Sequence, residues 1–138
     1  MALTECLNHL PVSYFQGYAK MHEFSIVQSL MELIERYARE QKATRVTKVV
    51  LSVGVLSGVE PHLLELAFNT FKEGTIADGA VLVIEVERLR VKCQECGKES
   101  QKEELSLFCP FCGSLNTEIT GGQDMVLKSL ELECSHEA

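Results

Sequence analysis

The sequence lacks features that would point to nucleic-acid binding, secretion or a membrane span. It has no basic excess, because 13 Lys and Arg stand against 20 Asp and Glu, which gives a formal net charge of −7. A nucleic-acid-binding protein needs a basic face to neutralise phosphates, so this class is disfavoured. No stretch reaches the roughly 18 apolar residues of a membrane span, and residues 1–20 contain no apolar core of a secretory signal. We therefore predict a cytoplasmic protein that binds neither nucleic acid nor membrane.

Recognisable catalytic motifs are also missing. We find no Ser/His/Asp set, no phosphate-binding P-loop and no evident pair of catalytic carboxylates. The chain has 138 residues, which suits one domain, or one domain that carries a small metal-binding module. We predict that the protein is not an enzyme.

The most informative feature present is a set of four cysteines. They form two Cys-x-x-Cys pairs, and each pair is followed at once by a glycine. Two such turns that face each other supply four thiolates at tetrahedral corners, which is the coordination that structural Zn²⁺ prefers. Cys6 and Cys134 are left over, with nothing to suggest that they pair, which favours a reducing cytosol. The predicted zinc ligands are Cys93, Cys96, Cys109 and Cys112.

Other interpretations of the cysteine pairs stay open. They could form disulfides, although a Cys-x-x-Cys disulfide is a small strained ring and no thioredoxin-like strand and helix surround these pairs. Iron could take the place of zinc, as in a rubredoxin-like redox carrier, which would be coloured when isolated. A zinc hydrolase is the least favoured alternative, because four cysteines leave no open coordination position for water.

The main alternative function is a zinc-ribbon module for protein interaction or nucleic-acid binding. Such a nucleic-acid module would need basic residues around the cysteine pairs. The loop at residues 94–108 instead has more acidic than basic residues, so it does not form a basic surface. These residues are Lys98 and Lys102, against Glu95, Glu99, Glu103 and Glu104.

The periodicity of apolar residues predicts the elements around the cysteine module. Ser25 and Gln28 read as a capping box that opens a helix, and Pro61 fits the first position of a second helix with Gly74 as its C-terminal cap. Alternating apolar and β-branched residues predict the strands. The predicted elements are a helix at 25–40, a strand at 45–56, a helix at 60–73, a strand at 80–90, a short strand at 117–120 and a return strand that contains Val126, Leu130 and Leu132.

These elements predict an α+β fold. The alternation at residues 80–90 indicates a sheet covered on one face only, so we expect a small sheet of about three strands with two helices on that face. The zinc-ribbon-like four-cysteine module is inserted between two strands of the sheet. We expect residues 21–90 and 122–133 to form an α/β domain, residues 91–121 the zinc module, and residues 1–20 a leader or extension, with Met21 as an alternative start.

Several stretches of the sequence resemble the HypA/HybF family of nickel metallochaperones. Met21-His22-Glu23 is similar to the family's opening, before an amphipathic helix. Leu56-Ser57-Gly58-Val59-Glu60-Pro61 resembles the segment that leads into its second helix, and the cysteine pairs resemble its zinc module. Thr120-Gly121-Gly122, followed by Met125, resembles its return strand. The resemblance covers about residues 21–133.

The resemblance implies a protein that binds Ni²⁺ and hands it to the large subunit of NiFe hydrogenase during maturation, in cooperation with the GTPase HypB. It implies that urease and its maturation proteins are partners in some organisms. It also implies that the zinc held by the four cysteines is structural. The nickel site falls on His22, with Glu23 beside it.

The chemistry of a nickel site at this position supports the same interpretation. Ni²⁺ favours a planar set of nitrogen donors. A histidine second from a free N-terminus offers its ring nitrogen, the terminal amine and the intervening amide nitrogens. If residues 1–20 are present, Met21 has no free amine and that donor is lost, so we expect the working protein to start at Met21.

Overall fold

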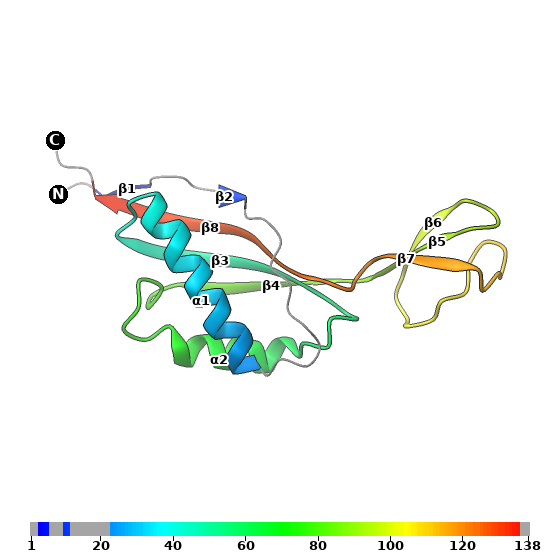
Figure 1. Cartoon of the computed structure of the whole chain (residues 1–138), viewed down its shortest axis with the longest axis horizontal. Helices are drawn as coiled ribbons and strands as arrows, with labels where there is room; N and C mark the ends of the chain where they lie inside the picture. The colour runs from blue at the N-terminus through cyan, green and yellow to red at the C-terminus, as the bar shows by residue number, and fades with distance from the viewer. Residues whose placement is uncertain (1–2, 6–9, 12–22, 136–138) are drawn as a thin grey trace.

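The computed structural model of the chain describes residues 3–5, 10–11 and 23–135. The molecule is elongated, with a larger body that contains both helices and a smaller lobe at one end (Figure 1). The helices are α1 (Glu23–Glu40) and α2 (Pro61–Phe71). The strands are β1 (Leu3–Glu5), β2 (Leu10–Pro11), β3 (Arg45–Gly54), β4 (Val81–Glu87), β5 (Leu89–Cys93), β6 (Glu99–Lys102), β7 (Thr117–Gly121) and β8 (Met125–Ser135).

Two separate sheets organise these strands. The larger sheet, in the body, has the order β1-β8-β3-β4, and β2 also pairs with β8. β3 is parallel to β4 and antiparallel to β8, and α2 lies in the connection that a parallel pair requires. The smaller sheet has the order β6-β5-β7 and forms what we call the metal lobe, from Leu89 to Gly121. The predicted α+β class, with two helices on a small sheet and a four-cysteine module, is confirmed.

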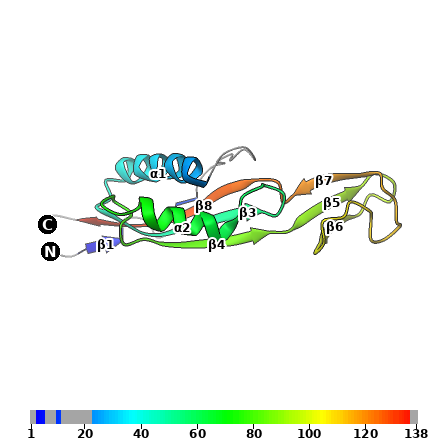
Figure 2. The ribbon, with the colours of Figure 1, turned by 90° about the horizontal axis from the view of Figure 1, so that it is seen from below.

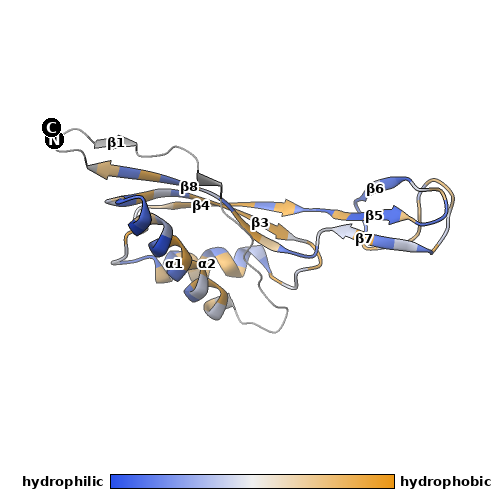
Figure 3. Cartoon of the chain, turned by 45° about the horizontal axis from the view of Figure 1, so that its top comes forward, coloured by the Kyte–Doolittle hydropathy of each residue, from blue (hydrophilic) through white to orange (hydrophobic). Residues whose placement is uncertain are grey.

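Both helices lie on the same side of the larger sheet (Figures 2 and 3). The hydrophobic core lies between the helices and this sheet. It includes aliphatic side chains from α1, β3 and β8 together with Phe68 of α2, which is fully buried. Phe71, at the end of α2, is 38% exposed and packs edge-on against Phe24 at 5.3 Å between ring centroids. Neither described helix has the length and apolar character needed to cross a lipid bilayer.

The two helices differ from prediction at their ends. α1 begins at Glu23, so Ser25 lies within the helix and the predicted capping box is wrong. In α2, Pro61 takes the first position as predicted, and Glu60 is the N-cap, with its carboxylate accepting a hydrogen bond from the Leu63 N–H at 2.8 Å. A carboxylate at this position also interacts favourably with the helix dipole.

The strand predicted at residues 80–90 is two strands, which belong to different sheets. β4 ends at Glu87 and β5 begins at Leu89, so the division falls at Arg88. Val86, near this point, is 55% exposed. The alternation of apolar residues continues from β4 into β5 without a break, because each sheet buries part of this stretch. The alternation alone therefore does not show that one strand ends and another begins.

A narrow waist of tightly packed backbone joins the body to the metal lobe. A Cβ atom on Gly54 would lie 2.3 Å from the Gly122 carbonyl oxygen, and Gly122 itself has a φ of +91°. These close approaches require glycine. The backbone N–H of Leu56 donates to Gly122 at 2.7 Å, and that of Val55 donates to Glu87 at 3.0 Å. The loop after β3 is thus hydrogen-bonded to both chain segments that enter and leave the lobe.

Residues before Met21 contribute to the body where they are described. β1 and β2 were not predicted, and both pair antiparallel with β8, with Leu3 opposite Ser135 and Leu10 opposite Leu130. The interpretation of residues 1–20 as a leader, and the division of the rest into two domains at residues 91 and 121, stay predictions.

Candidate metal centre

Two tight turns of the same kind carry the cysteine pairs. In the first, the Gly97 N–H donates to the Cys93 carbonyl at 3.0 Å, and Gly97 has a φ of +76°. In the second, the Gly113 N–H donates to the Cys109 carbonyl at 2.8 Å, and Gly113 has the same φ. This left-handed conformation is favourable for glycine and strained for other residues. Glycine after each pair therefore allows the turn to close.

The two turns face each other and bring four sulfur atoms together. The Sγ atoms of Cys93 and Cys112 are 3.6 Å apart, and those of Cys96 and Cys109 are 3.7 Å apart. All four sulfurs lie within 4.8 Å of one another. Sulfurs at about 2.3 Å from a tetrahedral zinc ion would be about 3.8 Å apart. The cluster thus fits a tetrahedral four-sulfur metal site.

Backbone amides stabilise a thiolate in each pair. The Cys96 N–H donates to the sulfur of Cys93 at 3.4 Å, and this hydrogen bond is the largest cause that lowers the pKa of Cys93. Burial alone would raise the pKa of Cys109, but hydrogen bonds from the backbone N–H groups of Cys112 and Phe111 help to lower it to about 6. The first cysteine of each pair is therefore the better thiolate.

The second cysteine of each pair holds its proton more strongly. The Ser114 N–H acts to lower the pKa of Cys112, yet hydrogen bonding to Cys93 and loss of water raise it to about 12. The pKa of Cys96 is also raised, against the effect of the Lys98 N–H, by loss of water and by its contact with Cys109. The contacts between Cys93 and Cys112 and between Cys96 and Cys109 thus each join a cysteine of lowered pKa to one of raised pKa. A bound metal ion displaces such protons, so affinity falls as pH falls.

The cluster lies at the surface of the metal lobe. Cys93 and Cys109 are each 1% exposed, whereas Cys96 and Cys112 are exposed. A metal ion here would be enclosed by four sulfurs and still lie close to solvent on one side.

The structure describes some of the predicted site residues and not others. It brings the four predicted cysteines together in one cluster. Glu23 is the first residue of α1, but its side chain is not among those described. His22 lies outside the described residues, so the nickel site stays a prediction.

The structural role of Lys102 is not evident from the sequence, in which it is one of the charges of the loop at residues 94–108. In the structure its side chain is only 6% exposed. Its ammonium donates to the Phe108 carbonyl at 2.6 Å and to the Ser106 hydroxyl at 2.8 Å, and it lies 3.6 Å from the centroid of the Phe108 ring. Lys102 thus holds the loop against Phe108, the residue before Cys109. The only feature of the sequence that could have indicated this contact is the aromatic residue six positions after Lys102.

The expectation for Cys134 is wrong. We expected it to be an unpaired thiol, but the structure has it in a disulfide. Its sulfur also lies 3.4 Å from the Gln41 carbonyl, in the loop after α1. Cys6 lies outside the described residues.

An α+β body joined through a glycine waist to a four-cysteine lobe defines a small metal-binding protein. The profile of the family described as "Hydrogenase/urease nickel incorporation, metallochaperone, hypA" matches residues 21–132. The chain belongs to this family, and the resemblance noted in the sequence is confirmed.

Individual relatives agree with this assignment. The chain is 73% identical over 113 residues to "Hydrogenase maturation factor HypA" of Aquifex aeolicus, covering 82% of this chain and 98% of that one. It is 45% identical over 118 residues to the protein of the same name from Shewanella oneidensis, covering 86% and 100%. Among solved structures, the solution structure of the Ni metallochaperone HypA from Helicobacter pylori matches with a TM-score of 0.61 at 34% identity, over 83% of this chain and all of that one.

Proposed function

We propose that this metallochaperone binds Ni²⁺ transiently at its N-terminal end and delivers it to NiFe hydrogenase, while a structural zinc ion fills the four-cysteine cluster. The observation that carries this proposal is the family match over residues 21–132. That range includes the Met21-His22-Glu23 opening and both cysteine pairs.

The cluster is suited to a resident metal. Its four sulfurs are spaced as a tetrahedral zinc ion requires, and a closed set of four ligands leaves no open position for substrate or water. Zinc bound there would supply folding energy rather than chemistry. Because no catalytic arrangement is evident among the described residues, we propose that the protein is not an enzyme.

The proposed nickel ligands are His22 and the neighbouring backbone nitrogens, with Glu23 beside them. Nitrogen donors of this kind suit the planar coordination that Ni²⁺ favours. A site with one side-chain ligand next to a helix end should release its ion faster than four sulfurs would. Such exchange is what delivery requires.

The proposed partners follow from the family's role. They are the GTPase HypB, the large subunit of NiFe hydrogenase and, where urease is present, its maturation proteins. The net charge of −7 argues against nucleic acid as a partner. A reduced four-thiol cluster argues for the cytoplasm as the place of action.

A nickel titration tests the proposal. We would titrate chains that begin at residue 1 and at residue 21, and measure zinc content in parallel. We expect both to carry about one zinc per chain, and the shorter chain to bind Ni²⁺ more tightly, because only it has a free amine at Met21.

The decisive variant is His22→Ala in the shorter chain. We expect it to abolish stoichiometric nickel binding and to leave zinc content unchanged. His62→Ala is the matched control, because His62 is exposed at the start of α2 and should not affect nickel binding. An unchanged nickel titration for His22→Ala would refute the site.

A further inference from the structure

One face of the small sheet in the metal lobe carries Cys93 together with two polar side chains. Leu89, Val91 and Cys93 alternate along β5 and are buried, so they share that face. Lys102 of β6 lies opposite Leu89. Thr117 of β7 lies opposite Cys93. Residues directly opposite each other in an antiparallel pair point to the same side of the sheet. Lys102 and Thr117 therefore lie on the same face as Cys93, one on each side of β5.

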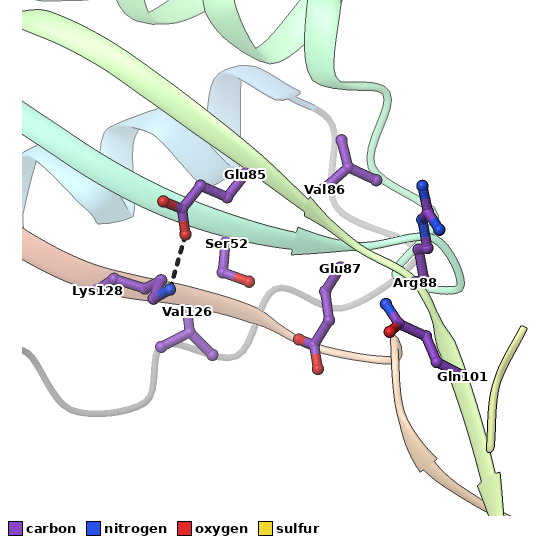
Figure 4. Close-up of a pocket in the computed structure, with 8 residues that line it drawn as sticks. All are labelled: Ser52, Glu85, Val86, Glu87, Arg88, Gln101, Val126 and Lys128. Atoms are coloured by element: carbon purple, nitrogen blue, oxygen red, sulfur yellow. Dashed lines mark hydrogen bonds and ion pairs between the residues drawn. The ribbon is translucent and has the colours of Figure 1, made fainter. Parts of the chain in front are cut away.

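The residue before Lys102 points the other way. Gln101 lines a hollow of about 440 Å³ at the waist, together with Glu85, Glu87 and other residues (Figure 4). Successive side chains of a strand point to opposite faces. Lys102 is accordingly directed away from this hollow and toward the loop at residues 103–108, where its hydrogen-bond partners lie.

Lys102 and Thr117 hold two consecutive carbonyl groups of the loop that leads to Cys109. The Lys102 ammonium donates to the Phe108 carbonyl at 2.6 Å, in a contact that is buried on the lysine side. The Thr117 hydroxyl donates to the Leu107 carbonyl. Apolar packing does little to hold this part of the loop, because Leu107 and Phe108 are 46% and 39% exposed. The two hydrogen bonds therefore fix where the second cysteine turn begins relative to the sheet that carries the first.

This link fixes the angle between the two cysteine turns. In a tetrahedral site, the line that joins the two sulfurs of one pair is perpendicular to the line that joins those of the other pair. In a planar site, which Ni²⁺ favours, the two lines are parallel. To pass from one arrangement to the other, one turn must rotate by about 90° against its partner. Such a rotation would break both hydrogen bonds to the loop.

We propose that Lys102 and Thr117 determine the metal specificity of the cluster, by holding the two cysteine turns in the tetrahedral arrangement that favours Zn²⁺ over Ni²⁺. A protein that carries nickel exposes its own cluster to that ion, and Cys96 and Cys112 are exposed. Nickel held by four sulfurs would be lost to delivery and would replace the zinc that the lobe needs. The inference rests on the proposed function in one respect only, that nickel is the cargo which the cluster has to exclude.

The test compares zinc and nickel in the same cluster. Lys102→Met keeps the apolar stem of the side chain, and Thr117→Val keeps its shape, while each removes the hydrogen bond to the loop. Both are made in the full chain with His22→Ala, so that the proposed nitrogen site takes no nickel. The reduced, metal-free chain is equilibrated with buffered Zn²⁺ and Ni²⁺ together. Elemental analysis gives the ratio of the bound metals, and nickel–thiolate absorption reports nickel bound to sulfur.

The expected effect is a change in preference between the two metals. We expect zinc affinity to fall by about 10–100-fold in the double variant, as is typical when groups that orient the ligands are lost. Nickel affinity should fall less, because Ni²⁺ does not favour the tetrahedral arrangement. The zinc-to-nickel ratio should thus fall by about tenfold, with bound nickel absorbing as a planar four-sulfur site. A purely structural role would weaken both metals alike and leave the ratio unchanged.

Two controls in the lobe separate the hydrogen bonds from other effects. Thr117→Ser keeps the hydroxyl and should retain the ratio of the unsubstituted cluster. Lys92→Met removes a positive charge beside Cys93, on the exposed face of β5 that points away from the loop, and should also retain it. A fall in the ratio for Lys92→Met equal to that for Lys102→Met would overturn the proposal, because it would show that charge alone sets the preference.

A third control concerns nickel bound away from the cluster. In the hollow of Figure 4, Glu85 is paired with Lys128 at 2.7 Å, and the Glu87 carboxylate lies nearby. Glu87→Gln should leave the nickel content of the double variant unchanged. A loss of that nickel on Glu87→Gln would place it in the hollow and overturn the proposal.

The result that most directly overturns the proposal is an unchanged zinc-to-nickel ratio in variants that circular dichroism shows to be folded. A cluster with Lys102 and Thr117 intact that takes nickel as readily as zinc would overturn it as well. Should Lys102→Met not fold, Thr117→Val decides alone, because it removes one hydroxyl from a half-buried residue. Absence of nickel binding at His22 would refute the proposed function and leave this test intact, since the ratio is measured without that site.

Discussion

The body and the metal lobe are held together by different forces. The contiguous apolar core lies in the body, between two helices and the larger sheet. The lobe buries few apolar side chains, among them Leu89 and Val91, and leaves large ones such as Leu105 and Leu115 more than half exposed. A small sheet of three short strands cannot bury enough apolar surface to be stable by itself. The lobe therefore depends on its cysteine cluster, whereas the body does not.

The strongest way to separate the two regions is to remove a ligand. Cys93→Ala should unfold the metal lobe, because structural zinc contributes on the order of 10 kcal/mol to folding. Limited proteolysis should then cut within residues 94–116, while circular dichroism still reports both helices. Leu115→Ala, at a side chain 78% exposed in the same loop, should show neither effect. Full protease resistance of a zinc-free Cys93→Ala variant would contradict the dependence.

A substitution in the core of the body should destabilise the body and leave the metal lobe unaffected. Phe68→Ala removes a fully buried ring from the core and should cost about 3–5 kcal/mol of unfolding free energy. The cluster is built from other residues, so zinc affinity should not change. Denaturant unfolding followed by circular dichroism, with a chelator competition for zinc, checks both parts. Leu66→Ala on the same helix, at a side chain 52% exposed, is the control and should be nearly neutral.

The waist should couple the two regions. Gly122→Ala would place a Cβ atom 2.8 Å from the Arg88 carbonyl oxygen, at a φ of +91°. We expect a cost of about 1–3 kcal/mol from the strained backbone alone. Hydrogen exchange should speed up at Leu56, whose N–H donates to Gly122. Gly79→Ala, where an added Cβ meets nothing within 4 Å, is the control; equal effects of the two substitutions would argue against a strained waist.

The smallest expected effect is that of acidic pH on the metal-free protein. The pKa of Cys109 is lowered from 9.0 to about 6, so this thiolate stabilises the folded lobe at high pH, and the contribution is lost as pH falls through about 6. Any order that the metal-free lobe keeps at pH 9 should therefore decrease on acidification over this window, while the body keeps its helix content. NMR signals of residues 93–113, followed from pH 9 to 5, would show this. A lobe that gains order as pH falls would reverse the assigned sign.

Local chemistry explains what could be predicted. Pro61, the glycine after each cysteine pair and the apolar periodicity of α1 act through neighbours in sequence, so the two helices and the two cysteine turns were predicted within a few residues of their observed bounds. The four cysteines were assigned to one cluster because each pair closes its own turn. The helix start at Ser25 was misplaced because Glu23 also tolerates helical backbone, and terminal residues carry little periodic signal.

The sequence predicts both helices, the strands β3, β7 and β8, the two cysteine turns and the family to which the chain belongs. Only the folded chain shows that residues 80–90 divide between two sheets, that β1 and β2 pair with β8, and that Lys102 is buried against Phe108. It also shows that, among the described strands, β4 lies at one end of the larger sheet. The reason is physical: a turn or a helix is stabilised by residues a few positions apart, whereas an edge, a waist and a buried ammonium depend on segments that meet only after the chain has folded.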